Sequence, residues 1–466
     1  MKKLNSFVCL TGLFAAAGVA ADKPNVVIIL ADDLGYGDIG CYGAEKIQTP
    51  NIDRLAREGR KFNSAYTASS ICSPSRYGLL TGRYAWRSSR HPKDVVLDPA
   101  APLVFDKGQM TLASLFKDNG YTTACIGKWH QGFGDGDNHT VKFDWNKSKL
   151  SPGPQEAGFD YFFGIAANVL NEPRAYIENY NFIDQTAVPP AHLVAGDFTA
   201  KAVEYIKKPK TKPFFIYFSS NVPHEPITPA AGAVGKSDCG LYGDFVQELD
   251  RNVGDILDAL AAAGELDNTL ILFTSDNGAA IHTPDSTAGM IARFTAHYSV
   301  RVAGHLQNGL FRGGKQRIND GGFRVPFIVR WPGHVPAGTQ SNSMISLVDM
   351  LATFSAMLGK PLPANAGEDS FNALPALTGK PDVKIRDHMI LQSGIGNLAI
   401  ISGGWKLVRR ETVPQQFMNY GDNQPQLYHL EKDPFEENNI LNKHPEKVKE
   451  LTGLLEKLQK ADRSRP

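Results

Sequence analysis

Four short, strongly apolar segments of this 466-residue chain end within a few residues of charged or polar side chains. Two of them precede pairs of oxygen-bearing residues: Asn25–Leu30 precedes Asp32 and Asp33, and Thr269–Thr274 precedes Asp276 and Asn277. Continuous apolar, β-branched runs of this length are typical of parallel strands covered on both faces. Open α/β sheets bind ligands outside the carboxyl ends of such strands. The sequence therefore predicts an α/β fold with its functional site at this edge of a mostly parallel sheet.

The acidic residues after these two strands predict a metal site. Adjacent carboxylates such as Asp32 and Asp33 repel each other, and a cation between them offsets the repulsion. With Asp276 and Asn277 they would supply four hard oxygen ligands, a set that favours Ca²⁺ or Mg²⁺ over Zn²⁺. We expect Ca²⁺ rather than Mg²⁺, because Ca²⁺ tolerates irregular and crowded coordination. A solvated turn is the alternative, and the buried strand before the pair favours the metal.

The other two apolar runs, Tyr121–Ile126 and Phe214–Phe218, lead to basic residues. Lys128 and His130 follow the first run, and residues two apart on an extended segment point the same way. His224 follows the second run between two prolines, which stiffen the backbone around it. The alternative is an ordinary surface loop with incidental polar residues.

The segment from Cys72 to Arg83 places a thiol beside a predicted helix start. Pro74 suits the first turn of a helix, so Cys72 would stand at the helix N-terminus. Unpaired N–H groups and the helix dipole there favour anions and lower the pKa of a thiol. Arg76 lies one turn further and can reach the same point. The alternative is a buried, unreactive cysteine beside a helix start.

Several separated blocks resemble the signatures of the formylglycine-dependent sulfatases, in the alkaline-phosphatase-like superfamily. They occur in the family's order and span nearly the whole chain after residue 21: the Cys-x-Pro-Ser-Arg and Leu-Thr-Gly-Arg runs (72–83), Gly-Lys-Trp-His (127–130), Pro-His-x-Pro (223–226), Gly-x-Lys (313–315) and Gly-Gly-x-Arg-Val-Pro (321–326). Asp320 stands where the family has Glu, so a structural carboxylate is kept on a shorter side chain.

The resemblance implies a large mixed, mostly parallel sheet flanked by helices, with a smaller C-terminal antiparallel subdomain. It also implies that a separate maturation enzyme converts Cys72 to formylglycine (3-oxoalanine), which hydrates to a diol and joins the four oxygen ligands at the Ca²⁺ ion. The same resemblance assigns roles to the remaining site residues. Arg76 orients the diol, and Lys128 and Lys315 bind the sulfate group. His224 protonates the leaving oxygen, and His130 takes a proton to expel sulfate.

The two ends of the chain differ in character from the middle. Lys2 and Lys3 precede the apolar run Phe7–Ala21, so residues 1–21 are predicted to be a signal peptide. Export to the periplasm or the medium follows, without stable membrane insertion, because the run is too short to span a bilayer. Composition changes over residues 360–384, which separates a predicted catalytic domain, 22–380, from a C-terminal subdomain, 381–466. Short alternating strands and a final helix are predicted in that subdomain.

The expected substrate is a sulfated saccharide. A formal net charge of +1 argues against a general nucleic-acid partner. The continuation 76–87 and the Gly304-His305 pair resemble carbohydrate 6-O-sulfatases acting on galactose or N-acetylgalactosamine. We therefore take His305 as a candidate substrate contact. Arg174 is another, from a segment (133–195) predicted to form long loops over the binding edge, although a salt-bridged surface explains Arg174 equally well.

Two other functions remain open at this level. One is a phosphodiester or phosphonate monoester hydrolase of the same superfamily, because formylglycine can also attack phosphorus. The other is a catalytically inactive protein that binds sulfated glycans. Such a protein would be expected to have lost the cysteine or a metal ligand, and this sequence keeps both.

Overall fold

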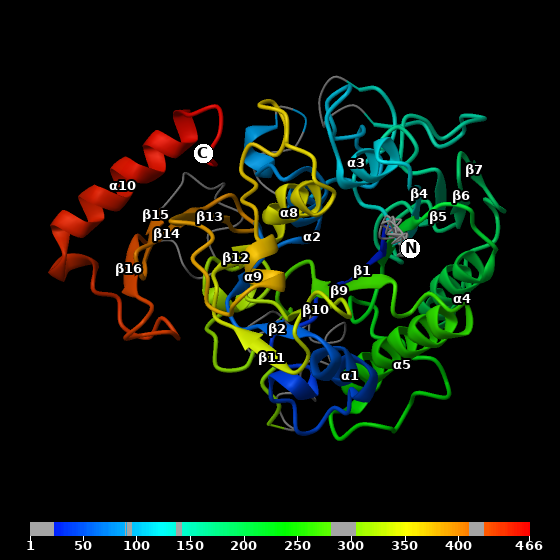
Figure 1. The fold of residues 1–466 in the computed structure, drawn as a ribbon, viewed down its shortest axis with the longest axis horizontal. Coiled ribbons are helices and arrows are strands. Elements are labelled where there is room, and N and C mark those ends of the chain that lie inside the picture. Colours follow the sequence, from blue (N-terminus) through cyan, green and yellow to red (C-terminus); the bar gives the residue numbers. More distant parts are fainter. Residues whose placement is uncertain (1–22, 89, 91–95, 137–141, 281–303, 410–423) are drawn as a thin grey trace, which may run out of the picture.

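The computed structural model describes residues 23–88, 90, 96–136, 142–280, 304–409 and 424–466, so the predicted signal peptide lies outside the described residues. A ten-stranded sheet runs through the body of the molecule in the order β11-β2-β10-β9-β1-β8-β4-β5-β6-β7 (Figure 1). Its strands are β1 (Asn25–Ala31), β2 (Arg60–Phe62), β4 (Thr122–Lys128), β5 (Tyr161–Ile165), β6 (Ile177–Glu178), β7 (Asn181–Phe182), β8 (Phe214–Ser219), β9 (Thr269–Ser275), β10 (Phe327–Arg330) and β11 (Thr339–Ser341). The five central strands, β9 to β5, are parallel, and antiparallel strands flank them. The predicted large mixed, mostly parallel sheet is confirmed.

Helices cover both faces of this sheet and create two cores. The helices are α1 (Pro50–Glu58), α2 (Cys72–Thr81), α3 (Leu112–Asp118), α4 (Val194–Lys207), α5 (Gly240–Ala262), α8 (Met350–Met357) and α9 (Leu374–Thr378). Alternate residues of β1 enter opposite cores: Val26, Ile28 and Leu30 pack with α2, α3 and α8, and Val27, Ile29 and Ala31 pack with α1, α4 and α5. A strand buried on both faces needs the unbroken apolar run seen in its sequence.

One prediction about local structure was wrong. Residues 133–195 do not only form loops, because β5, β6 and β7 extend the main sheet and β5 pairs in parallel with β4. The apolar run at Tyr161–Ile165 is short and follows many turn residues, which hid it. Shortly before α2, the chain passes from β2 to β3 (Ala65–Tyr66), which lies in a separate two-stranded sheet.

The C-terminal part forms the predicted small antiparallel sheet. Its strands are β13 (His388–Gln392), β14 (Leu398–Ser402), β15 (Trp405–Arg409) and β16 (Gln426–His429), and the helix α10 (Pro445–Lys460) follows them. Figure 1 shows α10 on the outer side of this sheet, away from the main sheet. Leu451, Leu455 and Leu458 of α10 pack on one face, and Tyr66, Ile318 and Phe323 of the catalytic body pack on the other. The sheet is therefore the middle layer between a terminal helix and the body, whereas a domain boundary at residue 380 stays a prediction.

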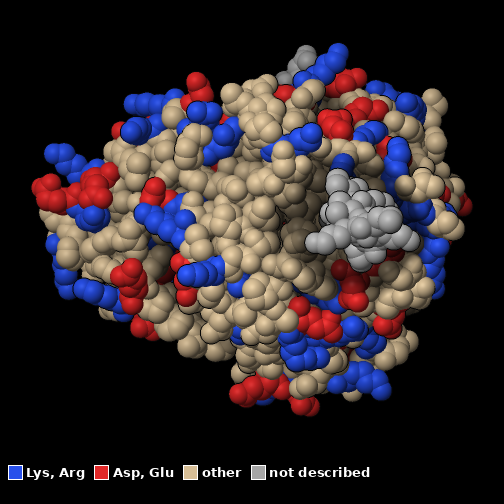
Figure 2. Space-filling view, viewed as in Figure 1, with Lys and Arg blue, Asp and Glu red and all other residues tan. Residues whose placement is uncertain are grey.

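The described surface, helices and cysteines add three facts. Figure 2 shows Lys and Arg interspersed with Asp and Glu around a central area of uncharged residues. None of the helices in the described ranges is long and apolar enough to cross a bilayer. The four described cysteines (Cys41, Cys72, Cys125 and Cys239) are all unpaired.

Candidate active site

The carboxyl ends of β1, β4, β8 and β9 bring the predicted site residues to one place around the start of α2. We call this group the Cys72 cluster; it comprises Asp32, Asp33, Cys72, Arg76, Lys128, His130, His224, Asp276, Asn277 and Lys315. Candidate ligand atoms of Asp32, Asp33, Cys72 and His224 all lie within 4.8 Å of one another. Residues from six distant parts of the sequence thus converge, as expected for the ligand-binding edge of an α/β sheet.

Cys72 is the first residue of α2, two residues before the predicted start at Pro74. Its side chain is buried, with 1% of the residue exposed. Burial opposes ionisation, but Lys128, Lys315 and hydrogen bonds to His130 and His224 hold the pKa of the Cys72 thiol well below its ordinary value. The residue is therefore an activated sulfur in an electropositive setting rather than an inert core thiol.

Three ion pairs hold the carboxylates of the cluster. The Nζ atom of Lys128 lies 2.7 Å from Oδ2 of Asp32, and Nζ of Lys315 lies 2.6 Å from Oδ2 of Asp33. Arg76 donates to Oδ2 of Asp276 at 2.9 Å and lies 3.4 Å from Oδ1 of Asp32. The fully buried guanidinium of Arg76 is thereby fixed between two strand ends.

The two acids that share Arg76 titrate differently. Burial opposes ionisation of Asp32, but Lys128, His224 and Arg76 hold its pKa well below the ordinary value. Burial raises the pKa of Asp276 above its ordinary value, and Arg76 only partly offsets this. The most strongly ionised carboxylate is thus the one nearest Lys128.

The donor set fits the predicted Ca²⁺ ion. The side-chain amide of Asn277 donates to Oδ1 of Asp33 at 2.8 Å and to the carbonyl oxygen of Gly278 at 2.9 Å. Its own oxygen, Oδ1, is buried and accepts no hydrogen bond from any described residue. A buried acceptor without a donor is costly unless a cation or other group satisfies it. Carboxylate and amide oxygens at this point match the ligands that Ca²⁺ takes.

His130 is arranged as a base. Its Nε2 atom donates to the carbonyl oxygen of Leu97 at 3.0 Å, which leaves a lone pair on Nδ1. Nδ1 is buried and has no hydrogen-bond partner among the described residues. Burial lowers the pKa of His130 despite its interaction with Cys72, so the ring is neutral near pH 7. The backbone at His130 is left-handed, with φ 52°, an uncommon conformation that turns the residue out of the line of β4.

His224 is arranged as an acid. Its Nδ1 atom donates to the carbonyl oxygen of Glu225 at 2.7 Å, which directs Nε2 toward Asp33, at 3.7 Å from Oδ2. Burial and Lys315 disfavour the charged ring, but Asp32 and Asp33 outweigh them and raise the pKa of His224. The two histidines therefore face the same place with opposite proton preferences.

Sequence reasoning missed two polar residues that support the cluster. Ser219, the last residue of β8, accepts a hydrogen bond from Arg76 and donates to the carbonyl oxygen of Lys128 at 2.7 Å. Gln131 donates to the carbonyl oxygen of Ser73 at 2.9 Å, which ties the β4 loop to α2. Ser219 lies at the end of an apolar strand, and this position was the available signal, because polar residues at the other strand ends are predicted to form the site.

The two candidate substrate contacts lie outside the cluster. Nε2 of the buried His305 ring is 2.8 Å from Oδ1 of Asp38, whose other oxygen accepts from Tyr242 at 2.5 Å. His305 also lines a separate cavity of about 270 Å³ beside the loop that follows β1. Arg174 lies on the surface, where its side chain is 41% exposed and pairs with Glu172 at 3.2 Å. In the described residues, these partners of His305 and Arg174 are not members of the Cys72 cluster, so a substrate contact by either residue stays a prediction.

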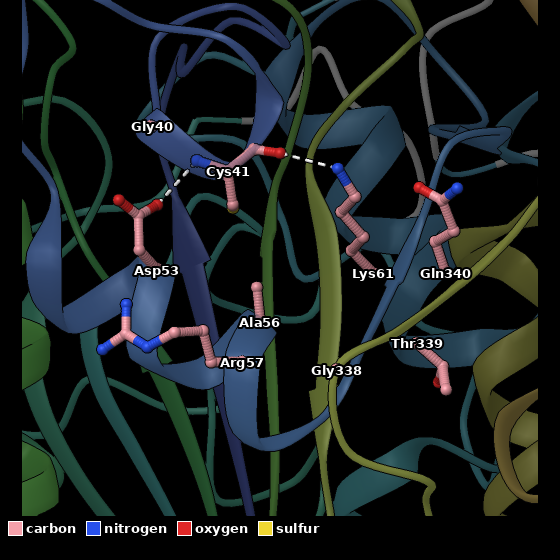
Figure 3. Close-up of a pocket in the computed structure, with 9 residues that line it drawn as sticks. All are labelled: Gly40, Cys41, Asp53, Ala56, Arg57, Lys61, Gly338, Thr339 and Gln340. Atoms are coloured by element: carbon pink, nitrogen blue, oxygen red, sulfur yellow. Dashed lines mark hydrogen bonds between the residues drawn. The ribbon is translucent and has the colours of Figure 1, made fainter.

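A larger surface cavity, of about 510 Å³, lies near the sheet edge that carries β2 and β11 (Figure 3). Its polar groups are engaged with one another: Lys61 donates to the carbonyl oxygen of Cys41, and Asp53 accepts from the N–H of Cys41. Burial and the nearby Asp53 raise the pKa of the Cys41 thiol, which makes it unreactive. Size alone does not mark the functional site in this molecule.

Comparison with known proteins agrees with this geometry. The sulfatase family model matches residues 24–360, and a model of the C-terminal part of N-sulphoglucosamine sulphohydrolase matches residues 309–463. The chain is 35% identical to an N-acetylgalactosamine-6-O-sulfatase of Bacteroides thetaiotaomicron over 95% of this chain and 94% of that protein. It is 32% identical to the human N-acetylgalactosamine-6-sulfatase, over 78% and 67% of the two chains.

A solved sulfatase from the glycosaminoglycan metabolism of Bacteroides thetaiotaomicron has the same fold. It superposes with a TM-score of 0.85 at 34% identity, and the match covers 95% of this chain and all of that one. The similarity thus extends through both the main sheet and the C-terminal sheet.

Proposed function

Because this chain belongs to the sulfatase family, we propose that it removes 6-O-sulfate groups from galactose or N-acetylgalactosamine units of a sulfated carbohydrate. The net reaction adds water to the ester, breaks the bond between sulfur and the sugar oxygen, and releases sulfate and the free alcohol. The observation that carries the proposal is the convergence of two lysines, two carboxylates and two histidines on the activated Cys72. The names of the relatives at 35% and 32% identity support the sugar and the position.

The side chains have distinct tasks in this reaction. Lys128 is a buried cation and Lys315 a partly buried one, and both offset charge on the sulfuryl oxygens, because preorganised charges in a largely buried site stabilise developing charge strongly. His224, with its raised pKa, gives a proton to the leaving sugar oxygen. His130 takes a proton at Nδ1, the ring nitrogen that is not engaged with the carbonyl oxygen of Leu97. Arg76, fixed by Asp276, orients the reacting oxygen.

Two groups that are not part of the encoded chain complete the site. We propose that Asp32, Asp33, Asp276 and Asn277 hold Ca²⁺, which when bound supplies a Lewis acid that polarises the ester. We also propose that a separate maturation enzyme converts Cys72 to formylglycine, whose hydrated aldehyde supplies an oxygen nucleophile. The low thiol pKa and the unsatisfied oxygen of Asn277 support these two assignments.

We propose export to the periplasm or the medium, since residues 1–21 combine a basic start with a short apolar run. An exported enzyme of this type meets sulfated polysaccharides outside the cytoplasm. Mass analysis of the N-terminus of the protein from its native compartment tests this, and an intact Met1 would contradict it.

The test of the proposed function uses the full chain, produced together with a formylglycine-generating enzyme. Released sulfate is measured with galactose and N-acetylgalactosamine sulfated at O4 or O6, with glucosamine 6-sulfate, and with phosphodiester and phosphonate monoester analogues. The expected result is the highest kcat/KM on a 6-sulfated galacto-configured sugar. Faster cleavage of a phosphorus ester would replace the proposal with the second superfamily activity. Binding of sulfated saccharide without release would assign a binding protein instead.

A further inference from the structure

A second buried group of charges lies between the catalytic body and the C-terminal sheet. We call it the Asp320 cluster; it comprises Tyr66, Asp320, Arg324, Lys406 and Glu436. The Nζ atom of Lys406, from β15, lies 2.8 Å from Oδ1 of Asp320 and 2.7 Å from Oε1 of Glu436. The second oxygen of Asp320 accepts from Tyr66 at 2.9 Å and from Arg324 at 3.3 Å.

The charges of this cluster balance, and the side chains of Asp320, Lys406 and Glu436 are fully buried. Oε2 of Glu436 also accepts from the backbone N–H of Asp320 at 2.7 Å. Removing one partner of a buried pair leaves an uncompensated charge in the interior. Lys406 thus fixes both the side chain and, through Glu436, the backbone of Asp320.

Asp320 opens a short 3-10 turn, η4 (Asp320–Gly322), that lies against a metal ligand. The N–H of Gly278 donates to the carbonyl oxygen of Gly322 at 3.0 Å. A Cβ atom at Gly278 would lie 1.8 Å from the carbonyl oxygen of Gly321, so the two backbones touch directly. Because Gly278 follows Asn277, a displacement of η4 transmits to the candidate Ca²⁺ ligand.

The same turn also braces Lys315. The N–H of Gly321 donates to the carbonyl oxygen of Arg312 at 2.8 Å, which closes the loop that carries Lys315. The N–H of Lys315 donates to the carbonyl oxygen of Ala279 at 2.9 Å. The backbone segments that carry Lys315 and Asn277 are therefore hydrogen-bonded to each other, and both are hydrogen-bonded to η4. We call these two segments the frame of Asn277 and Lys315.

We propose that Lys406 of the C-terminal sheet is a positioning residue for the reaction: through Asp320 and η4 it sets the places of Asn277 and Lys315. Lys406 touches neither substrate nor metal in this proposal, which rests on the proposed sulfatase function. The C-terminal subdomain is then part of the active-site frame and not an appendage. The shorter Asp320, where the family has Glu, is matched here by Glu436, which reaches Lys406 and the Asp320 backbone together.

The test compares Lys406→Met with the charge-balanced double variant Lys406→Met/Glu436→Gln, in the full chain matured in the same way. Misplacing catalytic groups by about 1 Å costs about 10²-fold in rate. We expect kcat/KM to fall about 30- to 100-fold in both variants. We expect the inhibition constant of inorganic sulfate to rise about 10-fold, since Lys315 loses its position.

Arg87→Met is the matched control. Arg87 also joins the body to the C-terminal part, because it pairs with Asp369 of the body at 2.9 Å and donates to the carbonyl oxygen of Leu458 at 3.0 Å, but none of its described contacts is with η4. We expect it to lower the thermal midpoint while kcat/KM and the sulfate constant, measured on folded protein, stay within about 2-fold. Equal losses in the control and the Lys406 variants would overturn the proposal, as would unchanged kinetics in the Lys406 variants.

Tyr66→Phe keeps the test decisive if the Lys406 variants do not fold. It removes one hydrogen bond to the Asp320 carboxylate and no charge, so it should fold and lose about 3- to 10-fold in kcat/KM. Unchanged kcat/KM and sulfate affinity in Tyr66→Phe would then overturn the proposal. If the parent protein proves to cleave no sulfate ester, the proposed function fails by itself, and equilibrium binding of inorganic sulfate to the same variants still decides the role of Lys406.

Discussion

The Cys72 cluster and the Asp320 cluster are both buried groups of charged residues, yet they are built for different ends. In the Asp320 cluster the two carboxylates share Lys406, and Asp320 also pairs with Arg324. In the Cys72 cluster the pairing also balances, with three carboxylates against three cations, but it leaves Nδ1 of His130 and Oδ1 of Asn277 without partners among the described residues. The Asp320 cluster is therefore occupied by its own ion pairs, whereas the Cys72 cluster keeps atoms that can bind a ligand.

This difference explains how a molecule can tolerate so many buried charges near a reaction centre. Lysines that neutralise carboxylates in the free protein can neutralise sulfate once a cation holds those carboxylates. The ion pairs of the Asp320 cluster do not change partners in this way, so they can have a purely structural role. Buried charge therefore indicates function only where its pairing is incomplete.

The largest expected effect comes from removing the centre of the Cys72 cluster. Cys72→Ala should lower kcat by about 10⁶-fold, the scale reported for loss of a nucleophile in a concerted site. Release of sulfate from a monosulfated saccharide measures this. Cys239→Ala serves as the control, because Cys239 is a buried cysteine outside the cluster, and it should keep parental activity. Comparable activity in Cys72→Ala would rule out the nucleophilic role.

Removing the cation should have the next largest effect. Exhaustive chelation should lower kcat/KM by at least about 10³-fold, because the ion supplies several kcal/mol of charge stabilisation. Added Ca²⁺ should restore activity more fully than Mg²⁺. If the chelated protein, verified as free of metal by elemental analysis, keeps its activity, the four oxygen ligands have another purpose.

The two histidines should separate by their response to the leaving group. His224→Ala should lower kcat about 10²- to 10³-fold for a sugar sulfate, whose alkoxide needs a proton, but less than about 10-fold for 4-nitrophenyl sulfate. His130→Ala should release one equivalent of alcohol per enzyme and then stop, whichever ester is used. Rapid-quench kinetics measures both. Equal sensitivity of His224→Ala to the two esters would contradict its role as the acid.

The free energy of unfolding should distinguish Lys315, whose partner Asp33 can be neutralised by Ca²⁺ instead, from Lys406, whose ion pairs are structural. With saturating Ca²⁺, Lys315→Met should change the free energy of unfolding by less than about 1 kcal/mol, because the ion then neutralises Asp33. Lys406→Met should cost about 3–5 kcal/mol, since it leaves Asp320 and Glu436 buried without their cation. Denaturant titrations with and without Ca²⁺ measure these free energies of unfolding. Equal losses of stability in the two variants would contradict the prediction.

The smallest effect is expected at Arg174. Its pair with Glu172 is exposed, so Arg174→Ala should change the free energy of unfolding by less than about 0.5 kcal/mol. As a candidate substrate contact it should raise KM a few-fold on polymeric substrate and leave KM unchanged for a monosaccharide. An unchanged KM on both substrates would show that Arg174 is a surface residue without a role in substrate binding.

Much of the Cys72 cluster could be predicted from the sequence because each part follows an unmistakable strand. Asp32, Lys128 and Asp276 sit one to two residues after long apolar runs, and parallel strands align their carboxyl ends. The four strands of the C-terminal sheet were visible for the same reason. Short strands such as β6 and β7 carry too few residues to show a period.

The Asp320 cluster could not be predicted in this way. Lys406 is a lysine in the short strand β15, where no sequence signal marks it as buried, and Glu436 lies in an irregular segment with a left-handed backbone, φ 58°. Nothing in the spacing of Tyr66, Asp320 and Lys406 marks them as neighbours, because their contact depends on how two sheets pack. Sequence patterns report what lies along an element and not which surfaces meet.

The long separation of these partners in the chain has a consequence for biosynthesis. A ribosome completes Cys72 and the first central strands early, but Lys406 and Glu436 emerge only near the end of translation. Contacts of such long range form late. Until then the frame of Asn277 and Lys315 has no anchor, and the proposed maturation enzyme would have to reach Cys72 before the fold closes, because only 1% of the residue is exposed in the finished fold. A nascent chain stalled before residue 406 should therefore be open to maturation but unable to turn over substrate.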